Sequence, residues 1–147
     1  MADLWLRPDH LFDGQHLRDG LALRLSGGRV AEIGPAPAHA QHVAGTITPG
    51  YVDLQVNGGG GVLLNQTPTP EGIAAIAAAH RRFGTVAILP TLITDAPDAL
   101  DRAAEAAIAA KGQPGIIGLH IEGPHISVAR KGTHDPRFIR PLDDRTM

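Results

Sequence analysis

A histidine and a glutamate two positions apart are the sharpest chemical signal in the sequence. His120 and Glu122 lie at the end of a short apolar run that begins at Ile116, and Gly123-Pro124 follows at once. Residues two apart on a strand point to the same face, so we expect the imidazole and the carboxylate to project together. Such a pair could bind a divalent metal, or the histidine could orient a carboxylate that binds one. A hydrogen-bonded pair with a purely structural role is the alternative.

Polar side chains also follow the two preceding apolar runs. Gln55 and Asn57 come after the first run, and Thr91 and Thr94 come after the second. In parallel α/β folds the carboxyl ends of the strands are where ligands bind, so these residues are candidates for a site. Strand ends are also polar simply because they emerge into water, and position alone does not decide between the two readings.

Two further segments have compositions that suit a ligand. In Lys131-Gly132-Thr133-His134 a cation, a hydroxyl and an imidazole lie close together, as a sugar or an anion would require, although loops are polar in any case. The glycine run from Gly58 to Gly61 fits no nucleotide-binding pattern, because Leu63 stands where GxGxxG needs its last glycine. We interpret this run as backbone room near a ligand.

The elements expected around these residues alternate between strands and helices. Apolar runs predict strands at 51–56, 86–89 and 116–121, and the run at 86–89 is typical of a strand covered on both faces. Caps and helical spacing predict helices over 69–84 and 97–110. The apolar face of the first helix is expected to include Ile73, Ile76, Ala77 and Phe83. The apolar face of the second helix is expected to include Leu100, Ala104, Ala107 and Ile108. This alternation indicates parallel strands with helical crossovers, in a doubly wound sheet or a (β/α)8 barrel. A barrel needs about 250 residues, so this chain would hold only its first three strands.

The first 48 residues have a different character. They read as short strands and turns, with a hairpin predicted at Gly27-Gly28, because paired glycines adopt the positive φ angles of two-residue turns. We therefore expect an α/β protein in two parts. Residues 1–48 would form a small β-sandwich-like segment, and residues 49–147 the first part of a barrel.

Composition restricts the classes of function. Of the 147 residues 43% are apolar and 19% charged, which is typical of a soluble globular protein. The net charge of -2 offers no basic field for a nucleic acid or an anionic membrane, and no apolar run approaches a membrane span. Cysteine is absent, so a metal must be held by His, Asp, Glu or backbone oxygen. The start of the chain does not resemble a signal peptide, and a cytoplasmic protein is the simplest expectation.

Four ordered motifs carry a family resemblance. Residues 48–58 resemble the segment that opens the barrel in amidohydrolases. Residues 90–94, 118–125 and 131–134 resemble N-acetylglucosamine-6-phosphate deacetylases in particular, and the likeness runs from 47 to 141. The resemblance implies a (β/α)8 barrel preceded by a small β domain, and an enzyme of amino-sugar metabolism.

The resemblance also implies roles for individual residues. Glu122 would be the carboxylate ligand of the catalytic metal, Thr133 and His134 would contact the amino sugar, and His120 would be a supporting neighbour. Many amidohydrolases carry a His-x-His pair that binds a second metal, where this chain has Gln55 and Asn57. Neutral amides are poorer ligands than imidazole, so we expect one divalent ion, whether zinc, iron, manganese or cobalt, with the two amides near its water.

The implied reaction is metal-dependent hydrolysis of the acetamide of N-acetylglucosamine 6-phosphate to glucosamine 6-phosphate and acetate. The resemblance places the aspartate base and the remaining metal ligands beyond Met147, so no catalytic base is expected within the chain. We expect a truncated, inactive fragment of an enzyme that is a homodimer at full length. Two alternatives stay open: an amidohydrolase acting on another amide, and a non-catalytic module that binds a sugar phosphate or a partner chain.

Overall fold

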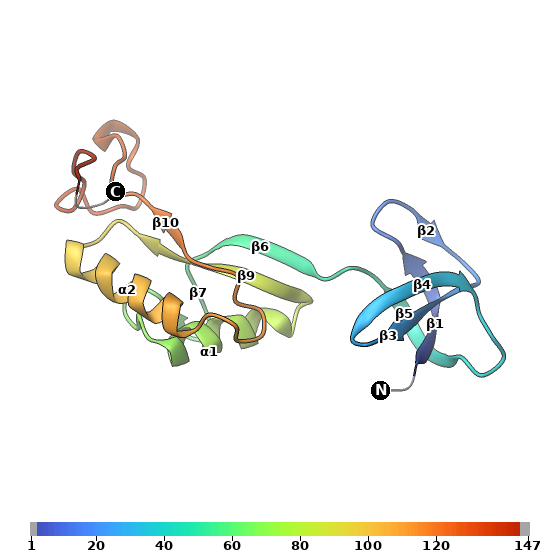
Figure 1. Ribbon diagram of the computed structural model, residues 1–147. Helices are drawn as coiled ribbons and strands as arrows, with labels where there is room; N and C mark the ends of the chain where they lie inside the picture. The colour runs from blue at the N-terminus through green and yellow to red at the C-terminus, as the bar shows by residue number, and fades with distance from the viewer. Residues whose placement is uncertain (1–2, 145–147) are drawn as a thin grey trace. The chain divides into compact units, whose positions relative to one another are not determined.

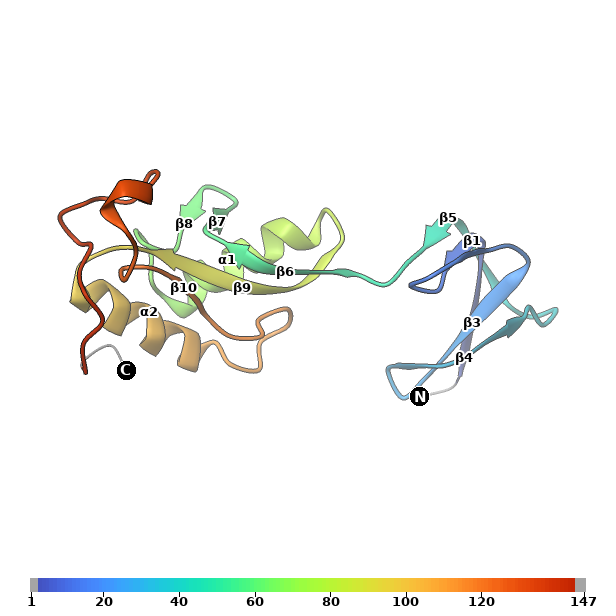
Figure 2. The same cartoon turned by 90° about the horizontal axis from the view of Figure 1, so that it is seen from above.

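The computed structural model describes residues 3–144. The chain forms two compact units, one up to Pro49 and one from Gly50 onward. The first unit is a five-stranded sheet (Figures 1 and 2). Its strands are β1 (Leu4–Phe12), β2 (Leu17–Arg18), β3 (Leu21–Ser26), β4 (Arg29–Pro35) and β5 (Gln41–Ile47). Strand β1 pairs antiparallel with β2 and β3 and parallel with β5.

The hairpin predicted in this unit is confirmed. Strands β3 and β4 are antiparallel neighbours, and the two residues between them, Gly27 and Gly28, have φ angles of 58° and 77°. The apolar core of the unit is small and includes Leu11, Ala22 and Leu23.

The second unit has a three-stranded parallel sheet in the order β10-β9-β6, and the chain is therefore a mixed α/β protein. Its strands are β6 (Tyr51–Val56), β9 (Thr85–Ile93) and β10 (His120–Glu122), and α1 (Pro70–Arg81) and α2 (Pro97–Ala109) are the two crossovers. A small ribbon, β7 (Gly58–Gly59) with β8 (Val62–Leu63), and a short 3-10 turn, η1 (Val128–Arg130), complete it. The predicted alternation of strands and helices is confirmed.

Two strand lengths differ from the prediction. Strand β9 continues to Ile93, through Pro90, whereas the third predicted strand shrinks to His120–Glu122. Ile116, where that strand was expected to begin, forms only an isolated bridge to Ile88. Gly118, with a φ of 158°, lies between this bridge and β10.

Helix α1 follows its sequence signals except at its end. The Thr69 side chain accepts a hydrogen bond from the Gly72 N–H, which caps the helix, and Ile73 and Ile76 are fully buried. Phe83, expected on the same packed face, is 81% exposed. The prediction for Phe83 is wrong because the helix stops at Arg81, before helical geometry could turn this ring toward the sheet.

Helix α2 packs through a stripe next to the predicted one. Its buried residues are the alanines Ala99, Ala103 and Ala106, whereas Ile108 is 73% exposed. Leu100 and Ala107 pack only at the edge of the core. Alanine side chains allow close approach of the helix to its neighbours, so small residues face the core here and the larger Ile108 does not.

Both helices lie on the same side of the parallel sheet (Figure 1). Ile88 and Leu92 of β9 belong to the core cluster with residues of α1 and α2. Val52, Leu54 and Val86 are more than half exposed. The expectation that the strand at 86–89 is covered on both faces is therefore wrong for the described chain, which covers one face only.

No helix within residues 3–144 is both long enough and apolar enough to cross a membrane.

Candidate functional site

The carboxyl ends of the three parallel strands bring polar residues together. Glu122 pairs in register with Ile93, next to Thr94, and Asn57 directly follows β6. The expectation that the polar residues after the strands meet at one edge of the sheet is confirmed for these three. This edge is the usual place of ligand sites in parallel α/β folds.

The Glu122 carboxylate lies between two other side chains. Its Oε1 atom is 3.5 Å from Nε2 of His134, and its Oε2 atom is 3.5 Å from the Asn57 Nδ2 that donates to it. Both separations are at the outer limit of a hydrogen bond. The Glu122 side chain is 32% exposed, so it is accessible to a ligand as well as to its neighbours.

His134 reaches this carboxylate from the loop after β10. The imidazole is buried, and its Nδ1 atom is 2.7 Å from the hydroxyl of Thr94. The same hydroxyl is 3.4 Å from the backbone oxygen of Glu122, to which it donates. Thr94 therefore connects the imidazole to the end of β10, a role that its place after a strand did not predict.

His120 and Gln55, also predicted near the carboxylate, form hydrogen bonds with other residues. The Nδ1 atom of His120 is 3.2 Å from the hydroxyl of the fully buried Thr91, which also accepts a hydrogen bond from the Val56 N–H. Gln55 is exposed, and its backbone N–H donates to the Asp53 carboxylate. Of the predicted residues, Asn57 and His134 thus each contact Glu122, while His120 and Gln55 form hydrogen bonds with other residues.

Arg140 fastens the loop that carries His134. Its backbone N–H donates to the Pro124 oxygen, its own oxygen is 2.9 Å from Nδ1 of His125, and its guanidinium donates to the Asp95 oxygen at 3.1 Å. These bonds join the end of the loop to the ends of both β9 and β10. The sequence contains no local signal for this role, because its partners lie 16 and 45 positions away.

A cavity of about 370 Å³ opens beside this group of residues. Its lining includes the polar residues Asn57, Asn65, Thr94, Asp95, Thr133 and Asp135. Hydrogen bonds from Arg137 lower the pKa of Asp135 to about 2, which keeps this carboxyl charged at neutral pH. Neither lysine nor arginine lines the cavity among the described residues, so it suits hydroxyl groups better than a phosphate.

The glycine run after β6 lies against a side chain of helix α1. Nε2 of His80, on α1, is 2.9 Å from the Gly58 oxygen, and a Cβ atom at Gly59 would lie 2.9 Å from the His80 ring. The His80 ring thus fills the space beside Gly59, whereas a Cβ atom at Gly61 would meet nothing within 4 Å, and the interpretation of the run as backbone room near a ligand stays a prediction.

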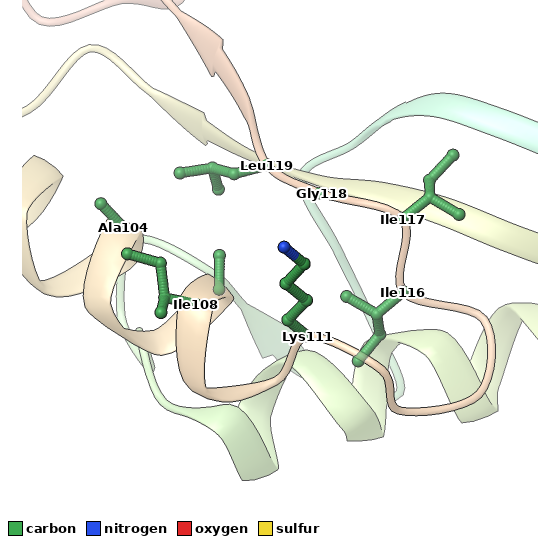
Figure 3. A pocket seen from close by; sticks show the side chains of 8 residues that line it. Ala104, Ile108, Lys111, Ile116, Ile117, Gly118 and Leu119 are labelled. Carbon is green, nitrogen blue, oxygen red and sulfur yellow. The ribbon is translucent and has the colours of Figure 1, made fainter.

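A second cavity, of about 380 Å³, lies between α2 and residues 116–119 (Figure 3). Its lining is apolar apart from Lys111, whose amine group extends between Ile108 and Ile116 in the view. Because it contains one cation and no partner for acid–base or metal chemistry, it is not a candidate active site.

The described residues do not form a complete metal site. Within residues 3–144 no group of three or more His, Cys, Asp or Glu side chains could hold a metal ion. Catalytic metal sites generally take three protein ligands, and the pair Glu122 and His134 presents one carboxylate and one imidazole. A carboxylate at this position fits a divalent ion, but the ion would need further ligands.

Parallel strands with helical crossovers, and polar residues gathered at their carboxyl ends, define the architecture of many α/β enzymes. No family model matches the chain. Individual proteins do match. The chain is 43% identical over 129 residues to the N-acetylgalactosamine-6-phosphate deacetylase of Shewanella sp. (strain ANA-3), covering 86% of this chain and 33% of the relative. It is 37% identical over 99 residues to the N-acetylglucosamine-6-phosphate deacetylase of Haemophilus influenzae, covering 65% and 26%.

Solved structures agree with these relatives. The N-acetylglucosamine-6-phosphate deacetylase of Pasteurella multocida superposes with a TM-score of 0.90 at 26% identity, covering 99% of this chain and 40% of that one. The enzyme of Mycobacterium smegmatis, as a D267A mutant in complex with N-acetyl-D-glucosamine-6-phosphate, gives 0.85 at 30% identity, covering 97% and 38%. The chain is a homologue of the N-acetylglucosamine- and N-acetylgalactosamine-6-phosphate deacetylases, which are hydrolases, and it spans about a third of the length of the curated relatives.

Proposed function

We propose that the protein containing this chain hydrolyses the acetamide of an N-acetylhexosamine 6-phosphate, releasing acetate and the hexosamine 6-phosphate. The observation that carries the proposal is the Glu122 carboxylate at the end of β10, flanked by Asn57 and His134 beside a polar cavity. N-acetylglucosamine 6-phosphate is the first candidate substrate. N-acetylgalactosamine 6-phosphate is the second, favoured by the 43% identity to a relative named for that sugar.

The proposed roles within the site follow from charge and position. Glu122 is proposed as the carboxylate ligand of one divalent ion, with zinc, iron, manganese and cobalt all compatible with oxygen and imidazole donors. When bound, the ion supplies a Lewis acid for the acetyl carbonyl. Asn57 holds the second carboxylate oxygen, so it is proposed to orient Glu122. Gln55 and His120 are proposed as more distant supports.

Thr133 and His134 are proposed to bind the sugar. Thr133 lines the polar cavity, and the neighbouring His134 contacts Thr94, which also lines the cavity, and Glu122. The fixed negative charge of Asp135 in the same lining favours neutral hydroxyl groups there. The phosphate would then be bound by residues outside the described cavity.

We also propose that residues 49–147 are the first part of a (β/α)8 barrel, with residues 1–48 as a small β domain before it. The consecutive order of the three parallel strands and the exposed apolar side chains of one sheet face support this, since a closed barrel would bury them. The 147-residue chain alone is then expected to be inactive, because the base and the remaining ligands would come from elsewhere. A homodimer is proposed for the longer protein.

The test is acetate release by the longest product that the gene encodes, with the two N-acetylhexosamine 6-phosphates and a panel of unrelated amides as substrates. Release from either sugar phosphate supports the proposal, and the ratio of the two kcat/KM values decides between the epimers. Activity on another amide alone would replace it with a different amidohydrolase. Tight binding of the sugar phosphate without acetate release would leave a non-catalytic binding module.

A further inference from the structure

We propose that Asn65 is a positioning residue, and that the Asp95 carboxylate, which it holds, binds the substrate by accepting hydrogen bonds from sugar hydroxyls. The naming of the ligand rests on the proposed function. The role of Asn65 rests on three hydrogen bonds of its side chain. The role of Asp95 rests on the donors that its carboxylate already has and on the cavity that it lines.

Asn65 pairs with the end of β9 as a further strand would. Its Oδ1 atom accepts a hydrogen bond from the Ile93 N–H at 3.2 Å, and its Nδ2 atom donates to the Ile93 oxygen at 3.1 Å. The pairing of β6 with β9 ends at Val56 and Pro90, before this residue. One side-chain amide thus satisfies both backbone groups of Ile93, directly before Thr94 of the candidate site.

The orientation of this amide is determined by its partners. Its third hydrogen bond runs from Nδ2 to Oδ2 of Asp95, 2.8 Å away. Carboxylate and carbonyl oxygens only accept, and a backbone N–H only donates. A flipped amide would place its oxygen against the two acceptors and its NH2 group against the Ile93 N–H. Only the observed orientation satisfies all three groups.

The segment that carries Asn65 is itself anchored to the candidate site. The neighbouring Leu64 is fully buried in the core, and its N–H donates to the Asn57 oxygen at 3.0 Å. The Asn57 side chain in turn donates to Glu122. Asn65 therefore fixes Asp95 relative to the residues that follow β6 as well as to the end of β9.

The Asp95 carboxylate keeps acceptor positions for a ligand. Its Oδ2 atom accepts from Asn65, and its Oδ1 atom accepts from the Ala96 N–H at 2.7 Å. An ionised carboxylate offers about four acceptor positions, so about two remain. Both of these donors are neutral, whereas the Asp135 carboxylate in the lining of the same cavity is paired with Arg137.

The cavity beside Asp95 suits neutral hydroxyl groups. It measures about 370 Å³, and its lining also includes Asn57, Asn65 and Thr133. A hexosamine carries several hydroxyls, and each of them can donate to a carboxylate. A hydrogen bond to a charged acceptor is about twice as strong as one between neutral groups. The free positions on Asp95 are thus matched by the hydroxyls of the sugar.

The role of Asn65 is tested by hydrogen exchange of the Ile93 amide in the full 147-residue chain. Asn65→Asp keeps the acceptor for the Ile93 N–H, but it removes both donated bonds and places two carboxylates side by side. Exchange should become at least about tenfold faster. Adding Asp95→Asn restores a donor opposite the new carboxylate, so exchange should be slower than in Asn65→Asp alone. Equal rates in Asn65→Asp and the unmodified chain, or in the single and double variants, would overturn this role.

The role of Asp95 is tested in the longest gene product, by acetate release from N-acetylglucosamine 6-phosphate and N-acetylgalactosamine 6-phosphate. Asp95→Asn should raise KM for the preferred sugar at least about tenfold and leave kcat within about twofold, because the bond is made equally in the ground and transition states. A variant that is merely less well folded would lower kcat at constant KM. Asp98→Asn makes the same chemical change at an exposed position of α2 and should alter neither quantity.

The two roles and the proposed function fail in different ways. Acetate release with an unchanged KM in Asp95→Asn would keep the proposed function and overturn the role of Asp95. No acetate release from either sugar phosphate would remove the proposed function together with the named ligand. The exchange rate of the Ile93 amide would still decide the role of Asn65, because it requires no activity.

Discussion

The hydroxyl oxygen of Thr91 accepts a hydrogen bond from the backbone N–H of Val56, 2.9 Å away. The regular pairing of β6 with β9 shifts between Asp53 and Val56, so the Val56 N–H needs a partner other than the next ladder carbonyl. A side chain on β9 supplies it, and the strand keeps its path toward Asn57. The Thr91 side chain thus satisfies the backbone N–H that the irregular pairing leaves without a ladder partner, just before the candidate site.

Thr91→Val is expected to destabilise the second unit by about 1–3 kcal/mol, because it leaves a buried N–H without an acceptor and removes the partner of His120. The specific readout is hydrogen exchange of the Val56 amide, which should become faster in the variant. Thr91→Ser keeps the hydroxyl and is the matched control. Equal exchange rates in the Val and Ser variants would contradict the assigned role.

Glu122→Gln is expected to lower acetate release by at least about 100-fold in the longest gene product, because removing a metal ligand should cost at least as much as removing an outer-shell partner. Metal content after dialysis should fall in parallel. Glu105→Gln makes the same chemical change at an exposed position of α2 and should leave both quantities unchanged. Full metal content in Glu122→Gln would show that this carboxylate is not a ligand.

Arg140→Ala is expected to loosen the loop that presents Thr133 and His134, because it removes the guanidinium bonds to the Asp95 and Phe138 oxygens. Hydrogen exchange of the His134 amide, which donates to the Lys131 oxygen, should rise by about tenfold, as the loss of about 1.4 kcal/mol would give.

The control for this loop is Arg137→Ala. Arg137 belongs to the same loop, but its side chain is 78% exposed and pairs with Asp135, so a smaller change in exchange is expected. A rise of the same size in both variants would mean that Arg140 holds the loop no more than a surface ion pair does.

The first unit is expected to lose stability between about pH 4 and pH 2. Hydrogen bonds from the backbone of His16 and Gln15, and then from Arg18, lower the pKa of Asp13 from 3.8 to about 2. A carboxyl whose pKa is lower in the folded state stabilises that state above its unfolded pKa, and the contribution is lost as the pH falls through the folded pKa. Asp13→Asn should therefore reduce the stability difference between pH 5 and pH 2.

The measurement is urea unfolding followed by the fluorescence of Trp5, the single tryptophan, which lies in β1. Asp19→Asn removes an exposed carboxylate from the same unit and should retain most of the wild-type pH difference. An undiminished pH difference in Asp13→Asn would assign the acid sensitivity to other groups.

The positions of the elements followed from local signals. Thr69 and Pro70 mark the start of α1, and the Gly27-Gly28 turn marks a hairpin, because caps and turns depend on the conformational preferences of a few adjacent residues. Packing faces were less predictable. In an alanine-rich helix such as α2 several stripes are equally apolar, and the choice among them depends on the surface that the helix meets.

By itself the sequence determined the order of strands and helices, the motif with Glu122 and His134, and the likeness to sugar-phosphate deacetylases. These depend on residue types and on short spacings. Only the tertiary structure decided that His134 meets Thr94, 40 positions earlier, that His120 contacts Thr91, and that His80 contacts Gly58. The physical reason is that such contacts are made between the ends of different strands and loops, where the partner is set by register and packing and leaves no periodic trace in the chain.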